Sequence, residues 1–205
     1  MRKLHIIPII HSRQDLGSLD VPIQEFKNKL LLDSSIRSSQ SVVENFWKEL
    51  RSGIESWQIE FDRIMIFQDA LPFTGHPEQI IEQKIVCDLA AKGSPNHQLL
   101  AWLMERGATL MGTESTELLL KEYDAVRKSL EDGFRGFEDE SNAEPGYTSL
   151  LTQRDQFIAN RISSTLQATQ VGILFIGMLH RVEDFLDGSI AVEHPFGKPK
   201  AMSQV

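Results

Sequence analysis

Cysteine is almost absent from this chain, which contains a single copy, Cys87, in 205 residues. One cysteine excludes an intrachain disulfide, and its place in a helical run between Val86 and Leu89 predicts a buried, unreactive thiol. No apolar run approaches the roughly 18 residues of a membrane span. The apolar part of the amino terminus is too short for a secretion signal, so we expect a cytoplasmic protein.

Positive charge is also in short supply. The chain has 21 Lys and Arg against 29 Asp and Glu, which gives a formal net charge of −8 at pH 7. An acidic surface repels phosphate backbones and anionic lipid headgroups, so it argues against nucleic acids and membranes as partners. It is compatible with metal ions and with a small-molecule or peptide ligand, and it leaves a homo-oligomer open.

The motifs that identify common enzyme classes are missing too. The sequence has no GxGxxG, Walker loop, GxSxG, HExxH or paired CxxC. The lack of a glycine-rich loop argues against nucleotide or phosphate binding at helix amino termini. Function must therefore be inferred from where the chain places its polar side chains.

Short apolar runs alternate with amphipathic segments along the chain. The predicted strands cover residues 4–10, 61–67, 108–111, 171–178 and 189–192, separated by predicted helices. The run 171–178 is uninterrupted and predicts the central strand. This alternation indicates one α/β domain over residues 1–195, a mostly parallel sheet covered by helices on both faces, and a loose polar tail over 196–205.

Local signals mark several helix and loop boundaries. His76-Pro77 and Ser94-Pro95 each predict the start of a helix, as does the capping-box spacing of Thr152 and Asp155. Asp155 is therefore interpreted as a helix cap in preference to a catalyst. Residues 133–146 are acidic, contain glycine and lack any apolar period, which predicts a mobile loop over the site.

Polar residues follow four of the predicted strands, where the carboxyl ends of parallel strands meet. They are His11, Ser12 and Arg13 after the first strand, Gln68 and Asp69 after the second, Thr113 and Glu114 after the third, and His180 and Arg181 after the fourth. Ligands of α/β proteins bind at this edge. Two imidazoles with carboxylates suit a divalent metal ion or general acid–base catalysis. The alternative for each histidine is a hydrogen bond to backbone alone.

Arg154 lies at the border of the apolar stripe on the predicted helix before the fourth strand. An arginine there is either paired with a buried carboxylate, such as Asp69 or Glu114, or directed at an anionic ligand. We favour the paired role, because buried arginines are structural more often than functional. Glu114 has its own alternative, which is to support the start of the following helix.

The run Arg154-Asp155-x-Phe157-Ile158-Ala159, followed by Gly177-Met178-Leu179-His180, resembles the TraB/PrgY superfamily. That group includes the Tiki metalloproteases, the haem-binding ChaN lipoproteins and the erythromycin-esterase-like hydrolases. Its pattern has an amino-terminal strand ending in a histidine, an R-[DN]-x-x-[MF]-A helix and a strand ending in Gly-x-x-His. The second half matches over residues 153–192. The resemblance implies an α/β fold with inverted or repeated halves and a histidine–carboxylate site, without implying one reaction.

The predicted function is a metal-assisted or histidine-based hydrolase acting on a small or peptide substrate. His11 and His180 would bind a divalent metal ion or act as base. Asp69 or Glu114 would be the third ligand or proton acceptor, while Arg154 and Arg13 would hold an anionic group. The alternative is a non-catalytic ligand-binding or regulatory protein on the same fold. It is favoured by Gln68-Asp69, which stands where many members of the resembled family carry a glutamate.

Overall fold

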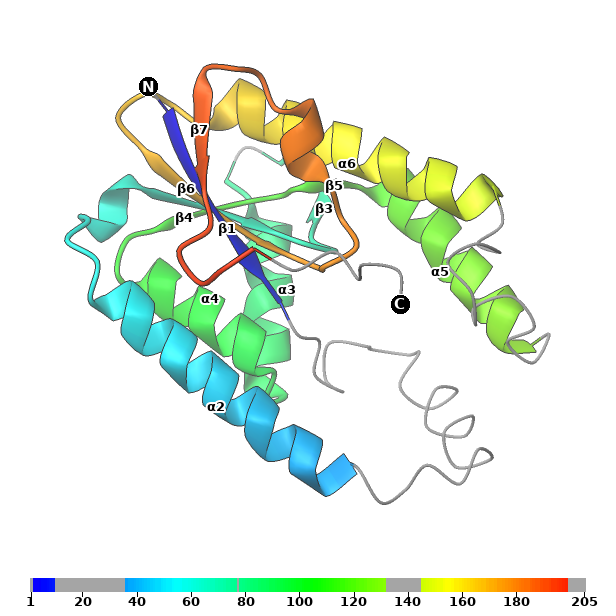
Figure 1. Cartoon of the computed structure of the whole chain (residues 1–205), viewed down its shortest axis with the longest axis horizontal. Helices are drawn as coiled ribbons and strands as arrows, with labels where there is room; N and C mark the ends of the chain where they lie inside the picture. The colour runs from blue at the N-terminus through cyan, green and yellow to red at the C-terminus, as the bar shows by residue number, and fades with distance from the viewer. Residues whose placement is uncertain (1, 10–35, 77, 132–144, 199–205) are drawn as a thin grey trace.

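The computed structural model describes residues 2–9, 36–76, 78–131 and 145–198 (Figure 1). A five-stranded sheet, in which all neighbouring strands run parallel, forms its centre. The strands are β1 (Arg2–Pro8), β2 (Ile64–Gln68), β4 (Thr109–Met111), β6 (Val171–Ile176) and β7 (Ile190–Glu193), in the order β4-β2-β6-β1-β7. The predicted α/β fold with a mostly parallel sheet is confirmed.

β6 occupies the centre of this sheet, as its uniformly apolar sequence predicts. Every residue from Gly172 to Ile176 is buried, because helices cover both faces of the sheet. β6 pairs with β1 as far as Pro8 opposite Ile176, and with β2 as far as Gln68 opposite Phe175. The carboxyl ends of β1, β2 and β6 therefore lie side by side at one edge of the sheet.

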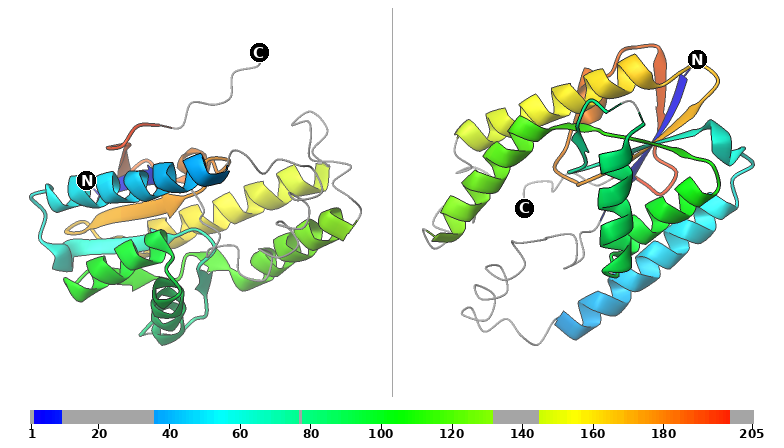
Figure 2. Two further views of the ribbon diagram at one scale, coloured as in Figure 1. Left: turned by 90° about the horizontal axis from the view of Figure 1, so that it is seen from below. Right: turned by 180° about the vertical axis from the view of Figure 1, so that it is seen from behind.

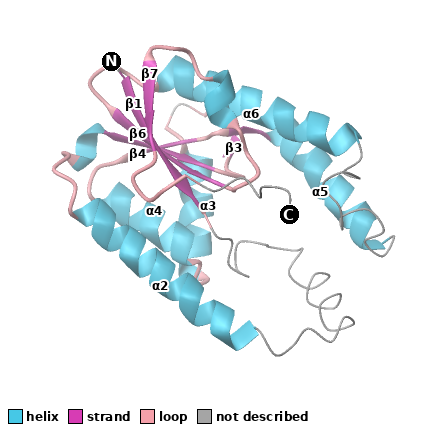
Figure 3. Cartoon of the chain, viewed as in Figure 1, coloured by secondary structure: helices cyan, strands magenta, loops and turns pink. Residues whose placement is uncertain are grey.

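The sheet lies between two helical layers (Figures 2 and 3). On one face are α2 (Ile36–Glu55), α3 (Ile80–Ala91) and α4 (Pro95–Glu105), which contribute to the larger apolar core. α6 (Pro145–Thr165) covers the other face and packs its apolar side chains on the second core. α5 (Thr116–Glu131) runs beside α6 and extends away from the sheet with it.

A two-stranded parallel sheet, which the sequence analysis did not predict, follows the ends of β2 and β4. It pairs β3 (Pro72–Phe73) with β5 (Glu114–Ser115). Gly112 permits this close approach, because a Cβ there would lie 2.7 Å from Cα of Phe73 and 2.8 Å from the carbonyl oxygen of Pro72. Strands of two residues carry no hydrophobic period, so sequence patterning does not reveal them.

The predicted starts of two helices are wrong. α6 begins at Pro145, so Thr152 and Asp155 lie inside the helix and do not cap it. The capping-box spacing is a purely local signal, and here the residues upstream continue the helix. α3 begins at Ile80 instead of His76, because the preceding Gln79 has a left-handed φ of 51° that interrupts helical geometry.

Two further boundaries can be compared with the sequence predictions. Ser94 caps α4 with its side chain, and Pro95 is the first helical residue, as predicted. Phe196, placed in the loose tail by the sequence analysis, packs on Trp57 with a ring-centroid distance of 6.0 Å. Packing against the main core thus continues beyond residue 195.

The environment of Cys87 differs from the prediction. Its thiol is exposed on α3, because the neighbouring Val86, and not Cys87, faces the core.

Other sequence predictions fall outside the described residues: His11, Ser12, Arg13 and most of the predicted mobile loop, residues 133–144. Pro145 and Gly146, the last residues of that loop, begin α6. Within the described part of the chain, no helix combines the length and apolarity needed to cross a membrane.

Candidate functional site

Four of the predicted site residues lie together at the carboxyl edge of the sheet. Asp69 follows β2, Glu114 lies in β5, Arg154 lies in α6, and His180 comes four residues after β6. All four side chains are buried, with exposed fractions of 6%, 0%, 4% and 5%, respectively. The fifth residue of the predicted group, His11, lies outside the described residues.

Every nitrogen of the Arg154 guanidinium contacts a carboxylate. Nε lies 2.6 Å from Glu114 Oε2, while Nη2 lies 2.6 Å from Glu114 Oε1 and 2.9 Å from Asp69 Oδ1. Nη1 lies 2.5 Å from Oε1 of Glu122, a residue of α5 that the sequence analysis missed. Of the two roles considered for Arg154, the structure shows pairing with protein carboxylates. The planar guanidinium is suited to this two-pronged contact, which a lysine ammonium cannot reproduce.

Asp155 holds the imidazole of His180. Its Oδ1 lies 2.6 Å from Nδ1 of His180, and its Oδ2 accepts a hydrogen bond of 2.9 Å from the backbone N–H of Arg181. An ionised carboxylate only accepts, so this contact places a proton on Nδ1. In the neutral ring, Nε2 is left as the basic atom, 3.6 Å from Asp69 Oδ1. The role as a helix cap predicted for Asp155 is therefore wrong.

Asp69 shapes the turn that carries His180. Its Oδ2 accepts a hydrogen bond of 2.9 Å from the backbone N–H of Gly177. The predicted fourth strand reached Met178, but β6 ends at Ile176, because the Gly177 N–H is directed to this carboxylate instead of to a neighbouring strand. The His180 N–H then donates to the Gly177 carbonyl, which closes the turn.

We call Asp69, Glu114, Glu122, Arg154, Asp155 and His180 the acidic cluster.

Glu114 also fixes the chain directly after Asp69. The backbone N–H of Ala70 donates to Glu114 Oε1 at 2.7 Å. Ala70 has a φ of 60°, in the left-handed region that residues with a side chain rarely adopt. Such conformations persist where surrounding contacts fix them, and they gather at functional sites. At Ala70, the hydrogen bond to Glu114 is such a contact.

The environment separates the pKa values of the clustered groups. Burial raises the pKa of Glu114 to about 7, although the hydrogen bond from Arg154 opposes it. For Asp69, burial acts to raise the pKa, but His180, Glu114 and Arg154 together lower it. For His180, burial acts to lower the pKa, but the hydrogen bond to Asp155 and the charge of Asp69 raise it. Near neutral pH, Asp69 is thus ionised while Glu114 is partly protonated.

We expect the free energy of unfolding to fall as the pH rises from about 4.5 to above 7. The unfolded chain releases the Glu114 proton near pH 4.5, whereas the folded chain holds it until about pH 7. The folded state therefore binds more protons in this window, and raising the pH favours unfolding, by roughly 3 kcal/mol in total. The pKa of His180 is raised above 6.5 in the folded state, so this residue also lowers the free energy of unfolding as the pH rises above 6.5.

Urea denaturation of the wild type and Glu114→Gln at pH 5, 6, 7 and 8 measures this effect. Glu114→Gln should flatten the decline, because the amide does not titrate. Glu117→Gln, on the exposed surface of α5, should keep the wild-type slope. A wild-type stability that increases steadily from pH 5 to 7 would contradict the prediction.

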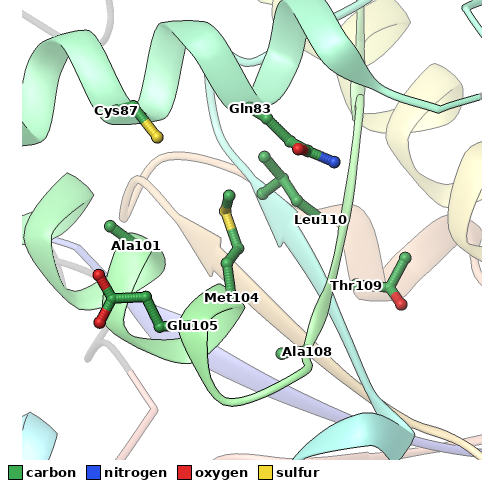
Figure 4. A pocket seen from close by; sticks show the side chains of 8 residues that line it. All are labelled: Gln83, Cys87, Ala101, Met104, Glu105, Ala108, Thr109 and Leu110. Carbon is green, nitrogen blue, oxygen red and sulfur yellow. The ribbon is translucent and has the colours of Figure 1, made fainter.

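The positions of two cavities in the described part of the chain can be compared with that of the acidic cluster. One, of about 420 Å³, includes Ala70 and Glu122 in its wall and so adjoins the acidic cluster. The other, of about 410 Å³, lies between α3, α4 and β4, where Cys87 and Met104 point toward one another (Figure 4). No residue of the acidic cluster lines this second cavity. The first cavity is therefore the one relevant to the candidate site.

Among the residues that the structure describes, no three His, Cys, Asp or Glu side chains are arranged to hold a metal ion. Comparisons of the chain with protein-family models, curated proteins and solved structures find no match. The chemistry of the site is therefore inferred from its own geometry.

Proposed function

We propose that the protein is a hydrolase in which His180 is the general base that activates a water molecule. The observation that carries this proposal is the 2.6 Å contact of Asp155 with Nδ1, which leaves Nε2 as the basic atom beside Asp69. A carboxylate in this position orients the imidazole and stabilises the imidazolium that forms when a proton is taken up. The substrate in this proposal is a small molecule or peptide with an ester or amide bond.

The carboxylates of the acidic cluster have different roles in this mechanism. Asp69, ionised and 3.6 Å from Nε2, stabilises the positive charge on His180 after it takes a proton from water. His180 then gives this proton to the leaving group as the ester or amide bond breaks. Glu114 is fully buried behind Arg154, so it acts as a positioning residue. It holds Arg154 on one side and the Ala70 turn on the other, which keeps Asp69 directed toward His180.

A divalent metal ion is the second form of this proposal. A carboxylate at Nδ1 also orients histidines that bind metals, so Nε2 of His180 and the Asp69 carboxylate would supply two ligands. In the prediction from the sequence, His11 is the second histidine ligand and Asp69 or Glu114 the third ligand. The metal ion would lower the pKa of a bound water molecule toward about 7. The resemblance of residues 153–192 to the TraB/PrgY pattern is in line with either form.

The second candidate is a non-catalytic ligand-binding or regulatory protein. It is favoured by the near-complete burial of His180 and Arg154 and by the carboxylate partners at every nitrogen of Arg154. In that case the acidic cluster stabilises the edge of the sheet. The wild type then shows no hydrolysis for a substitution of His180 to remove.

Hydrolysis of a panel of p-nitrophenyl esters and peptides by wild type and His180→Gln tests the proposal. We expect wild-type turnover and loss to background in His180→Gln, with an unchanged circular dichroism spectrum. His194→Gln, which alters a partly buried histidine paired with Glu183, serves as the control and should retain activity. Absence of turnover with every substrate would favour the binding protein.

Metal analysis separates the two forms of the hydrolase. The metal-assisted form predicts that the purified wild type contains stoichiometric metal. The metal should be lost in His180→Ala, and dialysis against EDTA should remove both the metal and the activity. Activity that survives EDTA supports His180 acting without a metal ion.

A further inference from the structure

The segment that follows β7 turns and packs on α2 (red in Figure 1). The N–H of Gly197 donates to the carbonyl oxygen of His194 at 3.1 Å, and Gly197 has a φ of 90°, in the left-handed region that favours glycine. The ring of Phe196 lies against Gly53 of α2, where a Cβ atom would be only 2.4 Å from the ring. We call residues 193–198 the C-terminal strap.

A buried histidine of the sheet lies next to this strap. His5 of β1 packs on Trp57 with a ring-centroid distance of 4.7 Å, and Phe196 of the strap packs on the same Trp57 at 6.0 Å. His5 is also the register partner of Glu193, the first residue of the strap. The strap therefore helps to exclude water from the imidazole, directly through Glu193 and indirectly through Trp57.

The imidazole of His5 lacks the partners that a positive charge would need. Its Nδ1 is buried without a hydrogen-bond partner, because the 3.3 Å contact with Oε2 of Glu193 is not aligned as a hydrogen bond. Glu193 is 45% exposed, and its other oxygen lies 2.8 Å from Nζ of Lys3. Water and Lys3 thus weaken the attraction of Glu193 for a proton on His5. A buried imidazolium would be poorly compensated in this position.

The charged groups around His5 lead to the same conclusion. Burial has the largest effect on the pKa of His5 and lowers it below 6.5, Glu193 acts to raise it, and Lys3 acts to lower it further. The neighbouring positions on β6 and after α2 are Ile173 and Trp57, which carry no charge. A hydrated histidine has a pKa near 6.5. Displacement of the strap would hydrate the ring, so the open state binds a proton more readily than the closed state, and acid favours opening.

A second anchor of the strap acts differently. Glu183 lies 3.0 Å from Nε2 of His194 and also contacts Lys198. Lys198 lowers the pKa of Glu183, so this carboxylate stays ionised at neutral and mildly acidic pH. A proton on His194 would strengthen its contact with Glu183 and so favour the closed strap. Opening in acid must therefore come from His5.

We propose that the C-terminal strap is a pH-sensitive switch, which is closed over Trp57 and Gly53 at neutral pH and opens as His5 takes up a proton. Opening uncovers the apolar surface that Phe196 covers at the end of α2. The acidic cluster takes no part in this switch, so the inference does not rest on the proposed hydrolase function.

Hydrogen exchange of the full-length protein at pH 7.5 and pH 5.5, corrected for the intrinsic pH dependence of exchange, measures the opening. The opening equilibrium of peptides covering the strap should rise about threefold to tenfold at pH 5.5, because uptake of one proton limits the change to about tenfold over this range. Peptides from α4 report global unfolding and should not gain exchange, since Glu114 makes global unfolding rarer at the lower pH. Strap exchange that does not increase at pH 5.5 would overturn the inference.

Variants assign the response to His5. The ratio of strap opening between the two pH values should fall to about one in His5→Gln, because the amide does not titrate. In Glu193→Gln the ratio should be kept or increased, because the group that favours a proton on His5 in the closed state is gone. His194→Gln is the matched control within the strap and should keep the wild-type ratio. Circular dichroism identifies any variant that fails to fold. An acid response that survives in His5→Gln, or that is lost in Glu193→Gln or His194→Gln, would overturn the assignment.

A further variant tests what closes the strap. Phe196→Ala removes the ring that packs on Trp57 and Gly53, so the strap should exchange at pH 7.5 at least as fast as the wild type does at pH 5.5. Wild-type protection in Phe196→Ala at pH 7.5 would show that Phe196 does not hold the strap closed, and would reject the switch.

Discussion

Replacing Arg154 with alanine should lower the free energy of unfolding by about 3–5 kcal/mol. The side chain is 4% exposed, and its guanidinium contacts Asp69, Glu114 and Glu122. Its loss leaves two buried carboxyl groups facing each other without a cation, in a place where water does not compensate them. Urea denaturation without ligand measures the effect. Arg154→Lys should recover only part of it, because a single ammonium cannot make the bidentate contact to Glu114.

Two further variants separate this electrostatic cause from lost packing. Adding Glu114→Gln to Arg154→Ala should restore part of the stability, because the amide cannot ionise beside Asp69. Arg63→Ala is the matched control, since Arg63 pairs with Glu60 on the surface with 61% of its side chain exposed. It should change stability by about 0–1 kcal/mol. A shift as small as this for Arg154→Ala would reject the structural ion pair.

Asp155→Asn should reduce kcat/KM for hydrolysis by about 10²–10⁴-fold while leaving the fold intact. The asparagine oxygen can still accept from the Arg181 N–H, but its amide then faces Nδ1 of His180. That contact favours the tautomer with the proton on Nε2, which removes the basic atom directed at Asp69. Steady-state kinetics on the best ester of the panel measures the loss.

The pH profile tests the cause of that loss. The hydrogen bond to Asp155 raises the pKa of His180, so the limb of the profile that depends on a deprotonated imidazole should move to lower pH in Asp155→Asn. Asp184→Asn, on the exposed 3-10 helix that follows His180, should leave both rate and profile unchanged. Wild-type activity in Asp155→Asn would remove Asp155 from the mechanism.

The arrangement of strands could largely be predicted from the sequence. The uninterrupted run 171–178 identified a central strand, and alternation with helices indicated parallel pairing. Both inferences depend on local hydrophobic patterning, which neighbouring residues determine. The two-residue strands β3 and β5 have no such pattern, although they position Glu114.

The sequence alone was enough to predict that Asp69, Glu114 and His180 follow parallel strands and therefore meet at one edge of the sheet. It also placed Arg154 beside them and left its partner open. The partners became clear only from the folded chain, since two of the three carboxylates that Arg154 contacts, Glu114 and Asp69, lie 40 and 85 residues away in the sequence. The structure also changed the role of Asp155. Because α6 begins at Pro145, Asp155 lies inside the helix and does not cap its amino terminus, and its carboxylate contacts His180 instead. Hydrophobic periods are local, whereas the pairing of buried charges depends on which distant segments pack together.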